Sequence, residues 1–242
     1  EFLHHRGILH RDIKPENILI RDDVLKVADF GSCRGIYSKQ PYTEYISTRW
    51  YRAPECLLTD GYYGYKMDMW GVGCVMFEIV ALYPLFPGSN ELDQIKKIHK
   101  VLGTPSDDIL MKFKAHGASH IEFDFPYVHV SDVTHSIHFN TNTNIKHSYY
   151  KGKSIAKSIS HVSSECADLI RKLVRYEPEH RLSARQALRH PWFRELREMQ
   201  QQQQMQQQHQ QQMSDNESTT SERSRGSQKS LRQHRLRYRA RS

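Results

Sequence analysis

The sequence predicts a mainly α-helical domain that carries one short β-hairpin and is followed by a disordered tail. Three observations support this fold class. The segment from Asp68 to Leu82 is apolar on nearly all sides, as expected of a helix at the centre of a domain. Two β-branched runs, residues 18–20 and 24–27, flank a polar Arg-Asp-Asp turn and predict the hairpin. Residues 200–212 are almost all Gln and residues 214–242 are rich in Ser and Arg, a composition that forms no packed core.

Start and stop signals define further helices. Residues 1–7 are typical of the end of a helix, which closes near Gly7. Asn90 has an acidic residue three positions later and caps a helix that is predicted to run to about Val101. The Gly103-Thr104-Pro105 sequence ends that helix.

The second half of the globular region has a long irregular stretch and then two helices. Residues 106–160 are predicted to be an inserted loop because they are rich in His, Ser, Thr and Asn. Apolar residues at helical spacing from Cys166 to Val174 predict a helix, and Ser183-Ala184-Arg185-Gln186 is a capping-box pattern that opens a last short one. The histidines of the insertion match no zinc template and are interpreted as part of a solvated loop: residues 116, 120, 129, 135, 138 and 147.

Charge and cysteine usage restrict the class of protein. The net charge is +8, and residues 214–242 supply +5 of it, from eight Lys or Arg and three Asp or Glu. The basic character therefore belongs mostly to the tail. Four dispersed cysteines without a C-x-x-C pair favour reduced thiols and a cytoplasmic or nuclear location. The most apolar run, Val72 to Leu82, is too short to span a bilayer, so no membrane association is expected.

Five motifs occur in a fixed order along the globular region. They are H-R-D-I-K-P-E-N at 10–17, D-F-G at 29–31, A-P-E at 53–55, D-M-W-G-V-G at 68–73, and Arg181 ahead of the last helix. Together they resemble the C-terminal lobe of a serine/threonine protein kinase. T-E-Y at 43–45 and T-R-W-Y-R at 48–52 make the chain similar to the CMGC group, which contains the MAP kinases. The predicted domains are then the kinase lobe over 1–195, a Gln-rich segment over 196–213 and a basic Ser/Arg-rich disordered tail over 214–242.

The resemblance implies roles for individual residues in phosphoryl transfer from ATP with Mg²⁺. Asp12 is expected to accept the proton of the attacking hydroxyl, and Lys14 to face the transferred phosphate. Asn17 and Asp29 are expected to bind magnesium through oxygen atoms. Thr48 is expected to bridge Asp12 and Lys14. The expected ATP-binding residues are Lys14, Glu16, Asn17, Leu19, Ala28 and Asp29.

The same resemblance implies a phosphorylation switch. Thr43 and Tyr45 are the expected phosphorylation sites, and a phosphate needs arginine partners. Arg11 and Arg34 match the positions that hold phosphothreonine. Arg49 and Arg52 match those that hold phosphotyrosine. Glu55 and Arg181 are expected to form a structural ion pair.

The position of the H-R-D motif suggests that part of the domain is absent. The motif begins at residue 10, so the N-terminal lobe, with its Gly-rich loop and strand lysine, is expected to be missing. The fold class is thus predicted as a kinase-like C-terminal lobe, helical with a short hairpin. The predicted function is an ATP-dependent, proline-directed serine/threonine kinase, and the 242-residue chain alone is expected to be inactive.

Several partners and one alternative function remain open at this level. The expected partners are protein substrates with Ser-Pro or Thr-Pro sites, together with an upstream kinase unless the protein phosphorylates itself. The alternative is a non-catalytic scaffold with a basic interaction tail. That tail could also bind nucleic acid or act as a nuclear import signal, against the simpler interpretation of a solvated disordered segment.

Overall fold

The computed structural model describes residues 1–42, 48–59, 61–115 and 152–211. The chain divides into two compact units, Glu1–Trp192 and Phe193–Ser242. The first unit carries every motif discussed above. It contains a helical core and two separate two-stranded antiparallel sheets.

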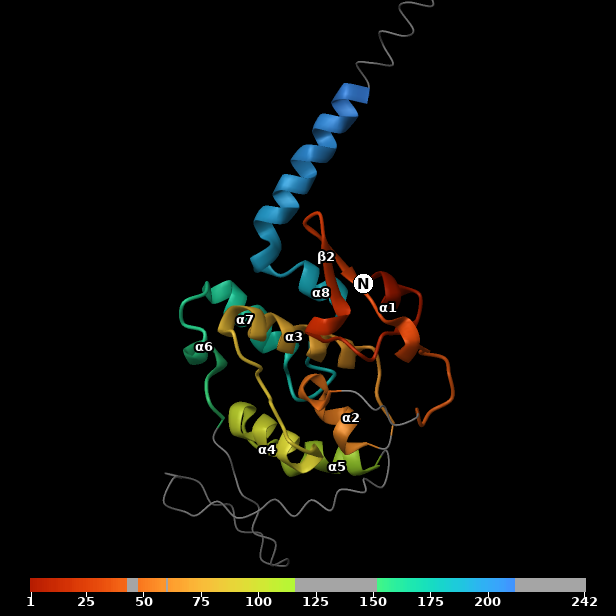
Figure 1. The fold of residues 1–242 in the computed structure, drawn as a ribbon, viewed down its shortest axis with the longest axis vertical. Coiled ribbons are helices and arrows are strands. Elements are labelled where there is room, and N and C mark those ends of the chain that lie inside the picture. The colour runs from red at the N-terminus through yellow and green to blue at the C-terminus, as the bar shows by residue number, and fades with distance from the viewer. Residues whose placement is uncertain (43–47, 60, 116–151, 212–242) are drawn as a thin grey trace, which may run out of the picture. The chain divides into compact units, whose positions relative to one another are not determined.

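The predicted hairpin is present, formed by β2 (Ile18–Arg21) and β3 (Val24–Val27). Asp22 and Asp23 connect the strands with φ values of 52° and 59°, the positive values that a tight two-residue hairpin turn requires. Asp tolerates this left-handed conformation better than most residues do. Figure 1 shows the hairpin extending from the domain. Several of its apolar side chains are exposed.

A second strand pair was not predicted. β1 (Ile8–Leu9) pairs with β4 (Arg34–Gly35), so that Leu9 lies opposite Arg34. The pair closes a loop that contains the H-R-D and D-F-G motifs. It therefore joins the residue before the H-R-D motif to the residues that follow the D-F-G motif.

The central helix is α3 (Lys66–Ala81), close to the predicted range. It packs against α7 (Ser164–Leu173) through Gly73. A Cβ atom on Gly73 would lie 2.7 Å from Val174 Cγ1 and 2.8 Å from Leu173 Cβ, so the two helices approach as closely as glycine permits. The fully buried indole of Trp70 stacks on Phe86 at 5.3 Å within the core.

The shorter helices surround this centre (Figure 1). They are α1 (Phe2–His5), α2 (Pro54–Leu58), α4 (Glu91–Leu102), α5 (Asp107–Ala115), α6 (Ile155–Ser158) and α8 (Ala184–Leu188). Both predicted caps are confirmed: Asn90 accepts from Asp93 N at 2.9 Å, and Ser183 forms a capping box with Gln186. The prediction that residues 106–160 are irregular throughout is wrong, because α5 and α6 lie inside that range.

The second unit is described as far as residue 211. Residues 194–211, which include most of the Gln-rich segment, are helical. The predicted disordered tail at 214–242 and the insertion histidines lie outside the described residues. No helix in the described ranges has both the length and the apolar composition that a membrane span needs.

Candidate active site

The site is built around the buried carboxylate of Asp12, which is 5% exposed. Lys14 Nζ lies 2.9 Å from Asp12 Oδ2. Asn17 Nδ2 donates to the same oxygen at 2.9 Å and to the Asp12 backbone carbonyl at 2.8 Å. A cation and an amide therefore fix the carboxylate in one place, and charge-assisted bonds of this kind are stronger than neutral ones.

The carboxylate of Asp68 stabilises the loop that carries Asp12 by accepting hydrogen bonds from its backbone. Its carboxylate accepts from His10 N at 2.9 Å and from Arg11 N at 2.8 Å, and it is itself buried. Arg11 has a φ of 71°, a strained value for a non-glycine residue. The two bonds from Asp68 stabilise this loop conformation and so set the direction in which Asp12 points.

His10 connects the loop to the strand ahead of D-F-G. Asp12 N donates to His10 Nδ1 at 3.3 Å, and His10 Nε2 donates to the Ala28 carbonyl at 3.0 Å. Ala28 N donates to the Asn17 carbonyl at 2.8 Å. The predicted magnesium ligands Asn17 and Asp29 are thereby brought together, because Asp29 directly follows Ala28.

The donor set of these two residues fits a magnesium ion. Both hydrogens of the Asn17 amide point at Asp12, which leaves Oδ1 as the atom that can face a cation. Asp29 is exposed and adopts the left-handed conformation, with φ 60°, and its carboxylate accepts from Gly31 N at 3.2 Å. A carboxylate and an amide oxygen are ligands that hard cations prefer. Among the described residues, no group of three or more His, Cys, Asp or Glu side chains could hold a metal ion, so the candidate magnesium ligands are one carboxylate and one amide oxygen.

The remaining predicted ATP-binding residues lie on the hairpin and beside it. Leu19, on β2, is 54% exposed and lies opposite Lys26. Glu16 is exposed in the short helical turn Pro15–Asn17. Ala28 follows β3 and is half-buried. Together they present an accessible, partly apolar surface next to Asn17.

The predicted phosphate-binding arginines fall into two groups. Arg11 is buried and donates from Nε to the Ser32 carbonyl at 2.5 Å and from Nη1 to Tyr63 Oη at 3.1 Å. Arg34 is exposed on β4 and pairs with Leu9, which lies two positions before Arg11 in the sequence. The predicted phosphorylation sites Thr43 and Tyr45 lie outside the described residues.

The second pair of arginines converges on one glutamate. Arg52 Nη1 lies 3.5 Å and Arg49 Nε 3.9 Å from Glu91 Oε1, at the first residue of α4. Arg49 is the first residue of the short helical turn Arg49–Tyr51, and Arg52 directly follows it. Thr48 precedes this turn and is exposed.

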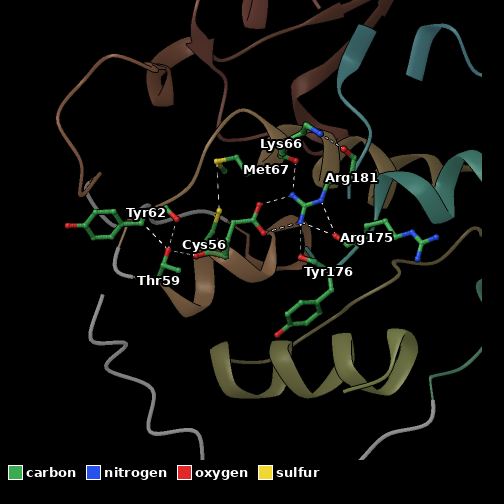
Figure 2. A network of polar contacts seen from close by, with 9 residues as sticks. Cys56, Thr59, Tyr62, Lys66, Met67, Arg175, Tyr176 and Arg181 are labelled. Carbon is green, nitrogen blue, oxygen red and sulfur yellow. Dashed lines mark hydrogen bonds and ion pairs between the residues drawn. The ribbon is translucent and has the colours of Figure 1, made fainter. Parts of the chain in front are cut away.

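Glu55 and Arg181 form a buried ion pair with bonds of 2.7 and 3.0 Å. Arg181 is 1% exposed and also donates to the carbonyls of Lys66, Arg175 and Tyr176, as Figure 2 shows. Its guanidinium lies 5.1 Å from the ring centre of Trp70. The pair thus connects α2, α3 and the segment after α7 inside the core.

Burial shifts the pKa of two groups close to the site. It raises the pKa of the Cys33 thiol, with a further contribution from the charge of Asp68. It also raises the pKa of Tyr63, against the opposing effect of Arg11. Both groups are therefore neutral near pH 7, so Cys33 is a thiol and Tyr63 keeps its hydroxyl hydrogen.

Sequence reasoning missed two residues that support the loop. Asp68 was recognised as part of a motif but not as the acceptor for His10 and Arg11. His4 donates from Nε2 to Asp68 Oδ2 at 2.8 Å and was not singled out at all. The sequence did contain a signal for Asp68: it is a carboxylate in the first turn of an otherwise apolar helix. A buried carboxylate needs hydrogen-bond donors, so such a residue indicates that buried donors lie nearby.

Comparison with known proteins places the chain among kinases. The model of the protein kinase domain family matches residues 1–193. The chain is 54% identical over 200 residues to the human MAPK/MAK/MRK overlapping kinase, covering 83% of this chain and 42% of that protein. It is 41% identical over 192 residues to cyclin-dependent kinase F-4 of rice, a match that covers 79% of this chain and 37% of that protein. It is 40% identical over 193 residues to the mouse serine/threonine-protein kinase ICK, a match that covers 79% of this chain and 27% of that protein. The chain spans about two fifths or less of the length of these relatives.

These comparisons confirm one prediction and correct another. The residues from Asp29 to Tyr45 resemble the MAPK/MAK/MRK overlapping kinase, and the identity over 200 residues confirms this resemblance. The predicted fold class, a C-terminal lobe whose N-terminal lobe is missing, is wrong, because the kinase domain match begins at the first residue. The expectation that the chain alone is inactive rested on that missing lobe and therefore loses its basis. The prediction took the position of one motif as a measure of the domain, and a motif's position does not show how far a domain extends.

Proposed function

The chain belongs to the protein kinase family, and on that premise we propose that the protein transfers the γ-phosphate of ATP to Ser or Thr hydroxyls of protein substrates. The observation that carries this proposal is the geometry at Asp12. Its buried carboxylate is fixed by Lys14 and Asn17, each 2.9 Å away. Such a carboxylate can accept a proton from a hydroxyl at a defined position.

Phosphoryl transfer requires little covalent chemistry from the protein itself. Phosphoryl transfer depends mainly on alignment of the reacting groups and on neutralisation of phosphate charge. Asp12 orients the attacking hydroxyl and takes its proton. Lys14, next to Asp12, directs a positive charge toward the transferred phosphate.

Asn17 and Asp29 would hold magnesium through Oδ1 and a carboxylate oxygen. The ion, when bound, neutralises charge on the phosphates. Leu19 and Ala28 would contact the adenine through apolar surface, with Glu16 at the edge of the nucleotide site. The exposure of Leu19 leaves room for that contact.

Regulation is proposed to depend on phosphorylation of Thr43 and Tyr45, by an upstream kinase or by the protein itself. Phosphothreonine would bind Arg11 and Arg34, and phosphotyrosine would bind the pair Arg49 and Arg52. Each phosphate adds close to two negative charges and accepts charge-assisted bonds from guanidinium groups. The ordered segment would then present the substrate to Asp12.

We propose that the preferred sites are Ser or Thr followed by Pro. The basis is the resemblance of residues 46–52 to the substrate-recognition segment of proline-directed kinases. Arg52, whose side chain is 15% exposed, would hold this segment in its conformation.

We also propose a cytoplasmic or nuclear location for the protein. The four cysteines, all of them free thiols, support this proposal, because disulfides are rare in these compartments.

A peptide comparison tests the proposal. The protein is incubated with magnesium-ATP and three peptides that differ only at the acceptor pair: Ser-Pro, Ser-Ala and Tyr-Pro. We expect transfer to Ser-Pro to exceed transfer to Ser-Ala by about tenfold or more, and no transfer to Tyr-Pro. An Asp12→Asn variant purified in parallel controls for contaminating kinases. Equal rates on Ser-Pro and Ser-Ala would refute the proline preference, and no transfer above the control would refute the kinase activity.

A further inference from the structure

Three segments that are distant in sequence are linked by a closed ring of hydrogen bonds. Trp50 Nε1 donates to the Gly88 carbonyl at 3.0 Å. Gly88 N donates to Gln94 Oε1 at 3.0 Å, and Gln94 Nε2 donates to the Trp50 carbonyl at 3.4 Å. The ring joins the turn Arg49–Tyr51 to the first turns of α4 through the loop that precedes this helix.

Gln94 is the centre of this ring. Its side chain is fully buried, and both ends of its amide are used, one as acceptor and one as donor. Gly88 fits against it closely, since a Cβ at that position would lie 2.4 Å from Gln94 Oε1 and 2.6 Å from its Cα. A buried amide that meets two backbone partners fixes their relative position, because an unmet partner would cost free energy.

The turn Arg49–Tyr51 is also bound to α4 by ion pairs. Glu91, one helical turn before Gln94, lies near the guanidinium groups of Arg49 and Arg52. Trp50 lies between these arginines in the sequence, and the residue is 37% exposed although its indole N–H is bonded. The N–H edge of the indole is therefore anchored, and part of the residue faces solvent.

We infer that Gln94 is a positioning residue for substrate recognition, acting through Trp50. The inference rests on the proposed function, in which residues 46–52 receive the peptide beside the acceptor hydroxyl. The amide of Gln94 bonds to the backbone of Gly88 and Trp50, and Gln94 lies 44 positions from Trp50 in sequence. It sets the backbone of the recognition turn and so affects peptide binding, while the nucleotide site around Asn17 and Asp29 is left unchanged.

The test compares Gln94→Met with Lys100→Met in the protein. Methionine has nearly the length of glutamine but cannot form the ring, and Lys100 is an exposed residue of the same helix. We expect Gln94→Met to raise the KM for a Ser-Pro peptide by about tenfold, equivalent to about 1.4 kcal/mol. The KM for ATP should stay within about twofold, and Lys100→Met should change neither value.

Two further variants keep the inference falsifiable if Gln94→Met does not fold. Trp50→Phe removes only the bond to Gly88, and Gln94→Glu keeps the acceptor for Gly88 N while losing the donor to Trp50. Both should raise the peptide KM by less than Gln94→Met does and leave the KM for ATP unchanged. The inference is overturned if these variants leave the peptide KM of an active kinase within twofold, or if the KM values for peptide and ATP rise together. A wild-type protein that phosphorylates no peptide overturns the proposed function and this inference with it.

Discussion

The side-chain amide of Asn17 donates to Asp12 twice, to the carboxylate at 2.9 Å and to the backbone carbonyl at 2.8 Å. The residue that would bind magnesium thus also fixes the residue that would accept the proton. The two halves of the proposed chemistry are therefore coupled through a single amide. Their separate contributions can be measured by substitutions that keep shape and change charge.

Asp12→Asn should lower kcat by at least about a hundredfold, since general bases typically contribute 10²–10⁴. The neutral amide cannot take a proton from the hydroxyl, whereas nucleotide contacts lie elsewhere. ATP affinity, measured by titration calorimetry, should change by no more than about twofold. Asp22→Asn, at the exposed hairpin turn, is the matched control and should leave both values unchanged. A kcat loss below about tenfold would contradict the role of Asp12.

Asp29→Asn should raise the magnesium concentration needed for half-maximal activity by about tenfold or more, because the site loses a charged ligand. Asparagine tolerates the left-handed backbone of Asp29, so the loop should be kept. Activity is measured across a magnesium titration at saturating ATP. An unchanged magnesium dependence would show that Asp29 is not a ligand.

Arg181→Met should destabilise the fold by about 3–5 kcal/mol, because it leaves Glu55 buried without its charge partner. Urea denaturation followed by circular dichroism measures the change. Arg185→Met, an exposed residue of α8, should cost less than about 1 kcal/mol. The double variant Glu55→Gln/Arg181→Met should recover part of the loss, and equal effects of Arg181→Met and Arg185→Met would rule out the structural role of the pair.

The free energy of unfolding should decrease as the pH falls below 7, because His99 is buried in the folded protein. Burial lowers its pKa to about 4 in the folded protein, against 6.5 when unfolded. Above pH 6.5 both states are neutral at this group. Between pH 6.5 and 4 the unfolded chain binds the proton more readily, so the free energy of unfolding decreases as pH falls, by about 2 kcal/mol from pH 7 to pH 5.

The contribution of His99 is isolated by difference. The urea midpoint of wild type should drop more between pH 7 and pH 5 than that of His99→Gln. His5→Gln, which alters an exposed histidine, should behave like wild type. Parallel pH profiles for wild type and His99→Gln would mean that His99 is protonated with its ordinary pKa.

Sequence signals were reliable where structure is local. Asn90 and Ser183 determine helix starts through bonds to residues three positions away, and the two aspartates between β2 and β3 determine a turn. The motif around Asp12 identified the residues that the structure brings together at the site. These features need no knowledge of the rest of the chain.

The features that were missed depend on contacts between distant residues. β1 and β4 have two residues each, too few to show an alternating pattern. The bonds from Asp68 to His10 and Arg11 cross more than fifty positions, and those of Gln94 to Trp50 cross forty-four. A buried polar side chain in a helix indicates that partners exist, but only the tertiary fold determines which they are.

The ion pair between Glu55 and Arg181 joins residues 126 positions apart. Because a ribosome makes the chain from its N-terminus, Glu55 emerges long before its partner does. Until Arg181 has been synthesised, the Glu55 carboxylate must stay hydrated. Packing α2 against α3 in the native arrangement before then would bury an unpaired charge. Completion of this core therefore requires synthesis as far as Arg181, and a chain that stops earlier leaves Glu55 without its charge partner and the core incomplete.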